Sequence, residues 1–136
     1  MTTATDAPVT TPSVLLVEDD AEIRTMLKST LELLFNYRVV TGCDGLEGLV
    51  AAAKFQPDVI LMDLAMPNMN GIEATHALKA QDATKDIPVI VLSNYAGVLT
   101  WRQQAEKAGC ARCVEKMLDP EELKQMIEEV LEETAA

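Results

Sequence analysis

The chain has 136 residues, of which 49% are hydrophobic, so it has room for one domain with a buried core. Its 22 acidic and 11 basic residues give a formal net charge of −11, which repels phosphate backbones, and we expect no nucleic-acid partner. Apolar runs such as Val59–Met62 are far shorter than the roughly 20 residues that cross a bilayer, and no signal-peptide pattern is visible, so we expect no membrane association. The odd number of cysteines favours a reducing, cytoplasmic location.

Short β-branched runs alternate with helical patterns along most of the chain. Residues 1–12 are rich in Thr, Ala and Pro and are predicted to form a flexible tail, before one folded domain over residues 13–133. Several of the runs are apolar almost throughout, as in a parallel sheet that helices cover on both faces. Five strands are predicted: Ser13–Val17, Arg38–Thr41, Asp58–Met62, Pro88–Leu92 and Ala111–Glu115.

Apolar residues with a 3.6-residue period predict helices between the strands. The pattern is clearest in the last helix, which opens with a capping Asp119 and a proline at its first position. Strands and helices in strict alternation predict an α/β fold of right-handed βαβ units around a parallel sheet. Five helices are expected, over about residues 23–34, 46–53, 71–79, 99–108 and 120–131.

Polar residues follow four of the predicted strands, at ends that converge on one edge of such a sheet. Carboxylates at this density repel one another unless a cation lies among them, and oxygen ligands favour Mg²⁺. A lysine and a hydroxyl beside the metal would bind an anion, which predicts phosphoryl chemistry with Asp63 as the nucleophile. The residues concerned are Glu18, Asp19 and Asp20 after the first strand, Asp63 after the third, Ser93 and Asn94 after the fourth, and Lys116 after the fifth.

Four segments with this order and spacing resemble the receiver domain of two-component response regulators. They are Val14–Asp20, Asp58–Gly71, Pro88–Ser93, and Ala108-Gly109 followed by Lys116. The resemblance covers about residues 13–133. It implies a CheY-like, flavodoxin-like (βα)5 fold, with a five-stranded parallel sheet in the order 2-1-3-4-5 and helices on both faces.

The resemblance implies a stand-alone response regulator, which is a phosphoacceptor signalling protein and not an enzyme. It would receive a phosphoryl group from a sensor histidine kinase or a histidine phosphotransfer protein. It would signal by altered binding to a downstream protein, through the face formed by the fourth helix, the fifth strand and the fifth helix.

The phosphoryl site implied by the resemblance has five positions in this chain. Asp63 would be the phosphoacceptor. Ser93 would supply the switch hydroxyl that turns toward the phosphoryl group, and Lys116 would pair with its oxygens. Backbone N–H groups at Ala65 and Asn94 would complete the pocket.

The implied Mg²⁺ site shares two residues, Asp63 and Ala65, with the phosphoryl site. Asp19 would be the direct ligand, Glu18 would hold the metal through water, and Asp63 would complete the carboxylate set. Ala65 would add its backbone carbonyl. For Asp20 we favour a different role, as the N-cap of the first helix.

The chain departs from the family pattern at positions that relay the signal. Cys113 replaces the usual switch aromatic, Met117 replaces a cis proline, and Asn94 replaces a small residue. These departures keep one alternative open, a receiver-like adaptor that works without phosphorylation. A second alternative is a phosphatase of the haloacid dehalogenase type, but Ala65 stands where such an enzyme needs its general acid. Ala65 and Tyr95 occupy positions that the resemblance associates with access of water to the acyl phosphate.

The pair Cys110 and Cys113 has the spacing of a redox or zinc motif. Residues three apart in an extended chain point to opposite faces, and no second pair or suitably placed histidine completes a zinc site. We therefore expect buried thiols. His76, the only histidine, is expected on the surface of the third helix.

Overall fold

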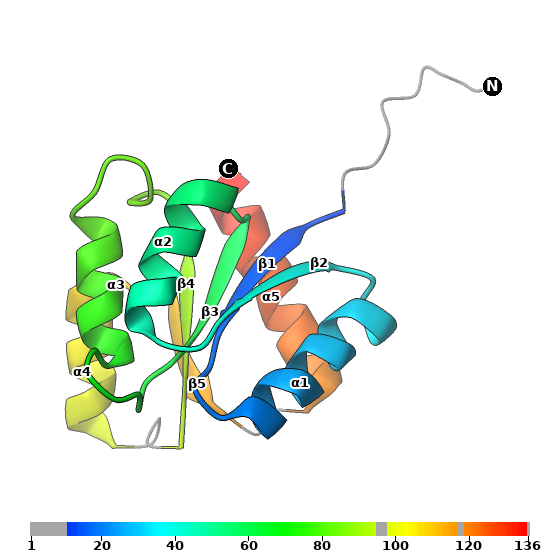
Figure 1. Ribbon diagram of the computed structural model, residues 1–136, viewed down its shortest axis with the longest axis horizontal. Helices are drawn as coiled ribbons and strands as arrows, with labels where there is room; N and C mark the ends of the chain where they lie inside the picture. Colours follow the sequence, from blue (N-terminus) through cyan, green and yellow to red (C-terminus); the bar gives the residue numbers. More distant parts are fainter. Residues whose placement is uncertain (1–10, 95–97, 117–118, 136) are drawn as a thin grey trace.

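A computed structural model describes residues 11–94, 98–116 and 119–135 of the chain. Its five strands form one parallel sheet in the order β2-β1-β3-β4-β5, with helices on both faces (Figure 1). The predicted α/β fold and strand order are confirmed. The strands are β1 (Ser13–Val17), β2 (Arg38–Gly42), β3 (Val59–Asp63), β4 (Val89–Ser93) and β5 (Arg112–Glu115). The helices are α1 (Ala21–Ser29), the π-helix η1 (Thr30–Leu34), α2 (Gly45–Phe55), α3 (Gly71–Lys79), α4 (Leu99–Ala108) and α5 (Pro120–Ala135).

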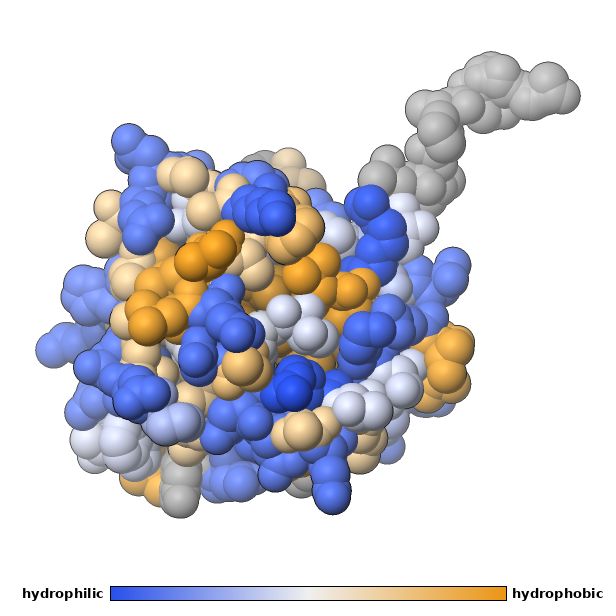
Figure 2. Space-filling model, in the orientation of Figure 1, coloured by the Kyte–Doolittle hydropathy of each residue, from blue (hydrophilic) through white to orange (hydrophobic). Residues whose placement is uncertain are grey.

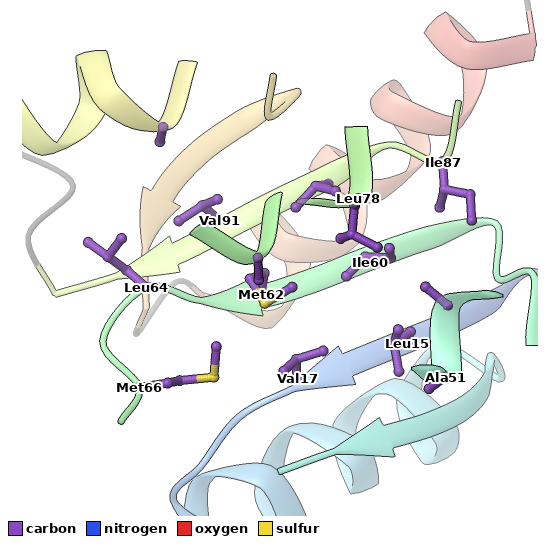
Figure 3. Packing of buried hydrophobic residues seen from close by; sticks show 14 of the residues in the cluster. Leu15, Val17, Ala51, Ile60, Met62, Leu64, Met66, Leu78, Ile87 and Val91 are labelled. Atoms are coloured by element: carbon purple, nitrogen blue, oxygen red, sulfur yellow. The ribbon is translucent and has the colours of Figure 1, made fainter. Parts of the chain in front are cut away.

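Two apolar clusters hold the helices to the sheet. Alternate residues of a strand point to opposite faces. Leu15 and Val17 therefore join the cluster under α2, α3 and α4 (Figure 3), while Val14 and Leu16 join the cluster under α1 and α5. All residues of β3 and β4 are buried. Each fully buried Leu or Ile side chain contributes roughly 1.5–3 kcal/mol to the free energy of unfolding.

Local signals fix the ends of several helices. The Asp20 side chain accepts hydrogen bonds from the backbone of Glu22 and Ile23, which confirms it as the N-cap of α1. Asn70 and Glu73 form a capping box that starts α3. Gly109 ends α4 with a φ of 106°, a conformation that favours glycine. None of the helices in the described ranges is both long enough and apolar enough to cross a membrane.

Two helices differ from the sequence prediction. The first predicted helix is not α-helical to its end, because residues Thr30–Leu34 form a π-helix, in which Leu34 is 67% exposed. In α2 the buried positions belong to Gly and Ala, whereas the larger Leu46 and Val50 face solvent. The reason is close packing: a Cβ on Gly48 would lie 2.9 Å from the Val17 side chain of β1.

The predicted boundaries of the tail and domain stay predictions. Residues 1–10 lie outside the described part of the chain. Residues 11 and 12 lead into β1, and the backbone carbonyl of Pro12 accepts a hydrogen bond from Arg38 of β2.

Candidate functional site

The carboxyl ends of the strands bring the predicted polar residues to one edge of the sheet. Glu18 follows β1, Asp63 ends β3, Ser93 ends β4 and Lys116 follows β5. Glu18, Asp63 and Ser93 are buried, with at most 2% exposure, although all three are polar. Asp19 lies beside them and is exposed. Burying a polar group costs free energy unless a partner satisfies it, so the partners of these side chains decide whether this edge stabilises the fold.

Three carboxylates meet closely enough to share one cation. A carboxylate oxygen from each of Glu18, Asp19 and Asp63 lies within 4.8 Å of the other two. Of the carboxylate oxygens of Asp63, Oδ1 lies 3.3 Å from Nζ of Lys116. The other, Oδ2, is buried and has no hydrogen-bond partner in the described chain. An orphaned carboxylate oxygen among two further carboxylates suits a hard divalent cation such as Mg²⁺, and the residues present therefore fit this metal.

The surroundings of Asp63 oppose its ionisation. Burial raises the pKa of Asp63, the nearby Glu18 carboxylate raises it further, and the result is about 7. Lys116 acts in the opposite direction and does not cancel the shift. A cation among these carboxylates would favour the ionised form, which is the form that can act as a nucleophile.

The side chain of Lys116, which follows the edge strand β5, reaches two carboxylates of the site. Its Nζ lies 3.0 Å from Oε1 of Glu18 as well as 3.3 Å from Asp63. Burial lowers the pKa of Lys116, but hydrogen bonds and charge from Glu18 and Asp63 outweigh burial, so the net shift is upward. Lys116 is therefore a fixed positive charge within reach of any anion attached to Asp63.

The loop after Asp63 approaches that residue too closely for any side chain at Gly71. A Cβ on Gly71 would lie 2.3 Å from the Asp63 carbonyl oxygen, and the Gly71 N–H donates to the Leu64 carbonyl at 2.8 Å. Ala65 and Asn94 are exposed at the rim of the site. Within the described residues the backbone N–H groups of Ala65 and Asn94 donate to no protein group. They are thus available to an incoming ligand.

Arg24 positions the acidic loop, although the sequence did not single it out. Nη1 of Arg24 in α1 donates to the backbone carbonyl of Glu18 at 2.8 Å, and it lies 3.4 Å from that of Asp19. The backbone N–H of Asp20 donates a hydrogen bond to Oε2 of Glu18 at 3.1 Å. No motif marks Arg24, because an arginine one turn into an amphipathic helix reads as an ordinary solvated residue.

Two of the departures from the family pattern, Cys113 and Asn94, fall within the described residues. Cys113 is buried on β5, opposite Val91 of β4. Met117 and Tyr95 fall outside the described residues. Cys110 packs on the same apolar cluster as Cys113, so the expectation that the two thiols point to opposite faces was wrong. The reason is that Cys110 lies before β5 begins, where the chain is not extended.

Cys113 is buried, as expected, whereas Cys110 is half-buried. Burial raises the pKa of Cys110 to about 11, and burial also raises the pKa of Cys113. Such thiols carry little thiolate at neutral pH and are poor nucleophiles and metal ligands. His76 is exposed on α3, as predicted.

Comparison with known proteins decides the family. The family model described as "Response regulator receiver domain" matches residues 14–128. The chain belongs to this family. Receiver domains are phosphoacceptor modules of two-component systems, and they bind Mg²⁺ in the acidic pocket at this edge of the sheet.

Receiver domains of several kinds resemble this one. Over 76% of the chain and 83% of the relative, it is 34% identical to the polar-differentiation response regulator DivK of Brucella anthropi. The chain is 40% identical to the transcriptional regulator PrrA of Mycobacterium tuberculosis over 68% of its length. It is 30% identical to the transcriptional regulator RpaA of Synechocystis over 90% of its length, and both relatives are longer than this chain. The aligned region spans 39% of PrrA and 50% of RpaA.

Solved receiver structures superpose closely. The chemotaxis protein CheY4 of Vibrio cholerae has a TM-score of 0.82 at 32% identity, over 89% of this chain and 99% of CheY4. The receiver domain of the sensor histidine kinase PA1611 from Pseudomonas aeruginosa also has a TM-score of 0.82, at 28% identity over 90% of this chain and 98% of that one. That structure has a magnesium ion coordinated in its active-site cleft.

Proposed function

We propose that this receiver domain accepts a phosphoryl group on Asp63 from a phosphohistidine, and that Glu18, Asp19, Asp63 and the carbonyl of Ala65 hold Mg²⁺ during the transfer. One observation carries the proposal: Oδ2 of Asp63 is buried without a partner, between two further carboxylates and a lysine. A nucleophile needs a free lone pair, and this is the one buried orphan side-chain oxygen in the described chain.

The residues of the site then divide the work of the transfer among them. Asp63 attacks phosphorus in line with the histidine nitrogen, so a new O–P bond forms as the N–P bond breaks, and the imidazole leaves with the bonding electron pair. Mg²⁺ would neutralise charge on the phosphoryl oxygens. Lys116 pairs with one of these oxygens, and the N–H groups of Ala65 and Asn94 donate to others.

Lys116 must change partners for this to happen. In the structure it binds Glu18 and Asp63. A phosphoryl group on Asp63 carries more negative charge than the carboxylate it replaces and offers oxygens farther from the backbone. Lys116 would therefore turn from Glu18 toward the phosphoryl group. Ser93, buried on the neighbouring strand end, would follow as the switch hydroxyl.

The donor is proposed to be a sensor histidine kinase or a histidine phosphotransfer protein in the cytoplasm, and the output is proposed to be binding of a downstream protein. The α4 end of the predicted output face supports the second part. Val98, Leu99 and Trp101 are 46%, 65% and 38% exposed there. Apolar groups in such a cluster are typical of a contact surface.

A small phosphodonor tests the proposal. The protein is incubated with acetyl phosphate, with Mg²⁺ or with a chelator, and its intact mass is measured. We expect one added phosphoryl group, only with Mg²⁺. No mass increase under either condition would favour the adaptor that works without phosphorylation. Steady release of phosphate from an aryl phosphate, with turnover, would favour the phosphatase.

A further inference from the structure

All but one of the exposed large apolar side chains of the described chain fall into two groups; the exception, Met26, lines a pocket with Lys116 and the start of α5. One group is the α4 group named above, Val98, Leu99 and Trp101. The other flanks the edge strand β2 and comprises Leu33, Leu34, Leu46, Val50 and Phe55, at 52% to 82% exposure. Figure 1 shows β2 at the outer side of the sheet, between α1 and α2, and Figure 2 shows apolar side chains gathered over α2 and β2.

The α2 side of this second group is a formed groove. It has a volume of about 420 Å³ and lies between the edge strand and the outer face of α2, where Thr41, Leu46, Val50 and Phe55 line it together with the charged Glu47 and Lys54. Leu46, Leu49, Val50 and Ala53 give α2 its helical apolar period, yet the positions against the sheet are Gly and Ala. Leu49 packs in part against the cluster under α2, α3 and α4. Leu46, Val50 and Phe55 are 52% to 67% exposed and bury little of their surface inside this chain.

The β2 backbone offers hydrogen bonds at the same place. The Arg38 N–H donates to Pro12, and the Gly42 carbonyl accepts from Glu18. The backbone N–H and C=O groups of successive residues in a parallel strand point alternately to its two sides. Those of Arg38, Val40 and Gly42 therefore point toward β1. The N–H and C=O groups of Val39 and Thr41 point outward, away from the sheet. An edge of this kind, flanked by apolar side chains, is a template for a further strand.

Charge decides which partner suits this edge. The chain as a whole carries −11, but residues 21–56, which include α1, η1, β2 and α2, carry four basic and four acidic residues. Residues 98–135 carry five basic and nine acidic residues. Two copies of an acidic chain repel each other, and they repel least where the facing segments are neutral. The second copy of this chain is therefore the partner that this edge fits, and a strongly basic partner would fit other faces better.

We propose that two copies of this chain associate through antiparallel pairing of their β2 strands, which joins the two sheets into one. A two-fold axis at Val40 places Val39 of each copy opposite Thr41 of the other, and about four main-chain hydrogen bonds result. The same axis brings the two α2 helices together on one face of the sheet and the two α1–η1 segments together on the other. Leu46 and Val50 are then covered on one face, and Leu33 and Leu34 on the other.

Sedimentation velocity over a range of protein concentrations tests the proposal, with two matched variants. Val50→Glu and Leu99→Glu each add one negative charge at an apolar site of similar exposure, 67% and 65%. Circular dichroism should show both variants folded, since neither side chain is buried. We expect the wild type to be in a monomer–dimer equilibrium. The dissociation constant of the dimer should be at least about tenfold higher in Val50→Glu and unchanged in Leu99→Glu. A wild type that stays monomeric up to about 1 mM, or a dimer that only Leu99→Glu weakens, would overturn the proposal.

Two further measurements address the strand pairing itself. Thr41→Pro removes an outward N–H that the sheet of the monomer does not use, so it should weaken the dimer and leave the fold intact. Raising the salt concentration should strengthen the dimer, because it screens the repulsion between two acidic copies. A dimer that is indifferent to Thr41→Pro, or that dissociates in salt, would contradict pairing at this edge.

The register gives a last test. Opposed residues that exchange no hydrogen bonds in an antiparallel pair have Cα atoms about 4.5 Å apart, within the range of a disulfide. Val40→Cys in a Cys43→Ser background should therefore cross-link two copies on mild oxidation. A solution that sediments as a dimer but gives no cross-linked species would contradict this register.

Discussion

The two ends of the sheet differ in whether their polar side chains have hydrogen-bond partners. At the amino end, Asp58 accepts hydrogen bonds from the Ser13 backbone at 2.8 Å and from its hydroxyl at 3.2 Å. Nearby, Lys79 Nζ donates to the carbonyls of Lys85 and Ile87. At the carboxyl end, Glu18 and Asp63 are both buried, face each other as like charges, and leave Oδ2 of Asp63 without a partner.

The difference separates the residues that hold the fold from those that prepare a reaction. A satisfied carboxylate such as Asp58 adds stability, and replacing it costs about 1 kcal/mol. An unsatisfied, buried carboxylate such as Asp63 lowers stability until a ligand satisfies it. Asp58 is therefore a control for Asp63, because it has the same side chain and directly precedes the strand that Asp63 ends.

The largest expected effect is on phosphorylation. Asp63→Asn keeps the shape of the side chain but cannot form an acyl phosphate, so phosphate incorporation from acetyl phosphate should fall to background. Asp58→Asn should be phosphorylated as the wild type is, although it weakens the amino end. Intact mass gives both results. Incorporation that persists in Asp63→Asn would move the phosphoacceptor to another residue.

The next largest effect is on how the free energy of unfolding depends on pH when no metal is present. The pKa of Asp63 is raised from 3.8 to about 7, so between these values the folded protein holds a proton that the unfolded chain has lost. The free energy of unfolding should therefore fall as pH rises from about 4 to 7, by about 2–4 kcal/mol from this group. Urea unfolding of the wild type against Asp63→Asn isolates the contribution, since Asn does not titrate. Identical pH profiles for the two proteins would show that Asp63 is not destabilised by its surroundings.

Magnesium should reverse part of that loss. At pH 7.5 a saturating concentration should raise the free energy of unfolding by about 1–3 kcal/mol, since the ion binds the native state. Asp19→Ala should lose most of this gain, whereas Asp58→Ala should start lower and gain as much as the wild type. Thermal melts with Mg²⁺ and with a chelator measure all three. Equal gains in Asp19→Ala and the wild type would remove Asp19 from the metal site.

The smallest effect concerns the lifetime of the phosphoryl group. Ala65 is exposed at the rim and offers no side-chain hydrogen bond to water. Ala65→Asn should orient a water toward phosphorus and shorten the lifetime about threefold, well below the roughly 10²–10⁴-fold of full general acid–base assistance. Decay of the phosphorylated mass after removal of the donor gives the rate. A variant that decays as slowly as the wild type would show that this position does not govern access of water.

Much of the fold was predictable because its signals are local. Asn70 and Gly71 start α3, Gly109 ends α4, and both helices have the bounds that the sequence predicts. The strand order followed from the family resemblance. The carboxylates, the serine and the lysine of the candidate site were found by their place after strands, which any parallel sheet brings to one edge.

What the sequence did not predict depends on distances between elements. The π-helix at Thr30–Leu34 has the same apolar residues that an α-helix would have, so the hydrophobic pattern does not separate the two. Leu31 and Tyr37 pack in the cluster under α1 and α5, a set of contacts between elements that the pattern does not show. The burial pattern of α2 follows from the close approach of Gly48 to Val17. Arg24 acts through two backbone carbonyls, and backbone acceptors leave no trace in the sequence.

The close approach of α2 to the sheet has a consequence for how this chain tolerates change. In most amphipathic helices the large apolar positions are the least replaceable, whereas in α2 the least replaceable position should be Gly48, where even alanine meets Val17. Leu46 and Val50 should accept almost any side chain as far as folding is concerned. A library of variants selected only for folding would therefore keep the small residues of α2 and randomise the large exposed ones. Selection for function would keep these large residues only where a partner covers them.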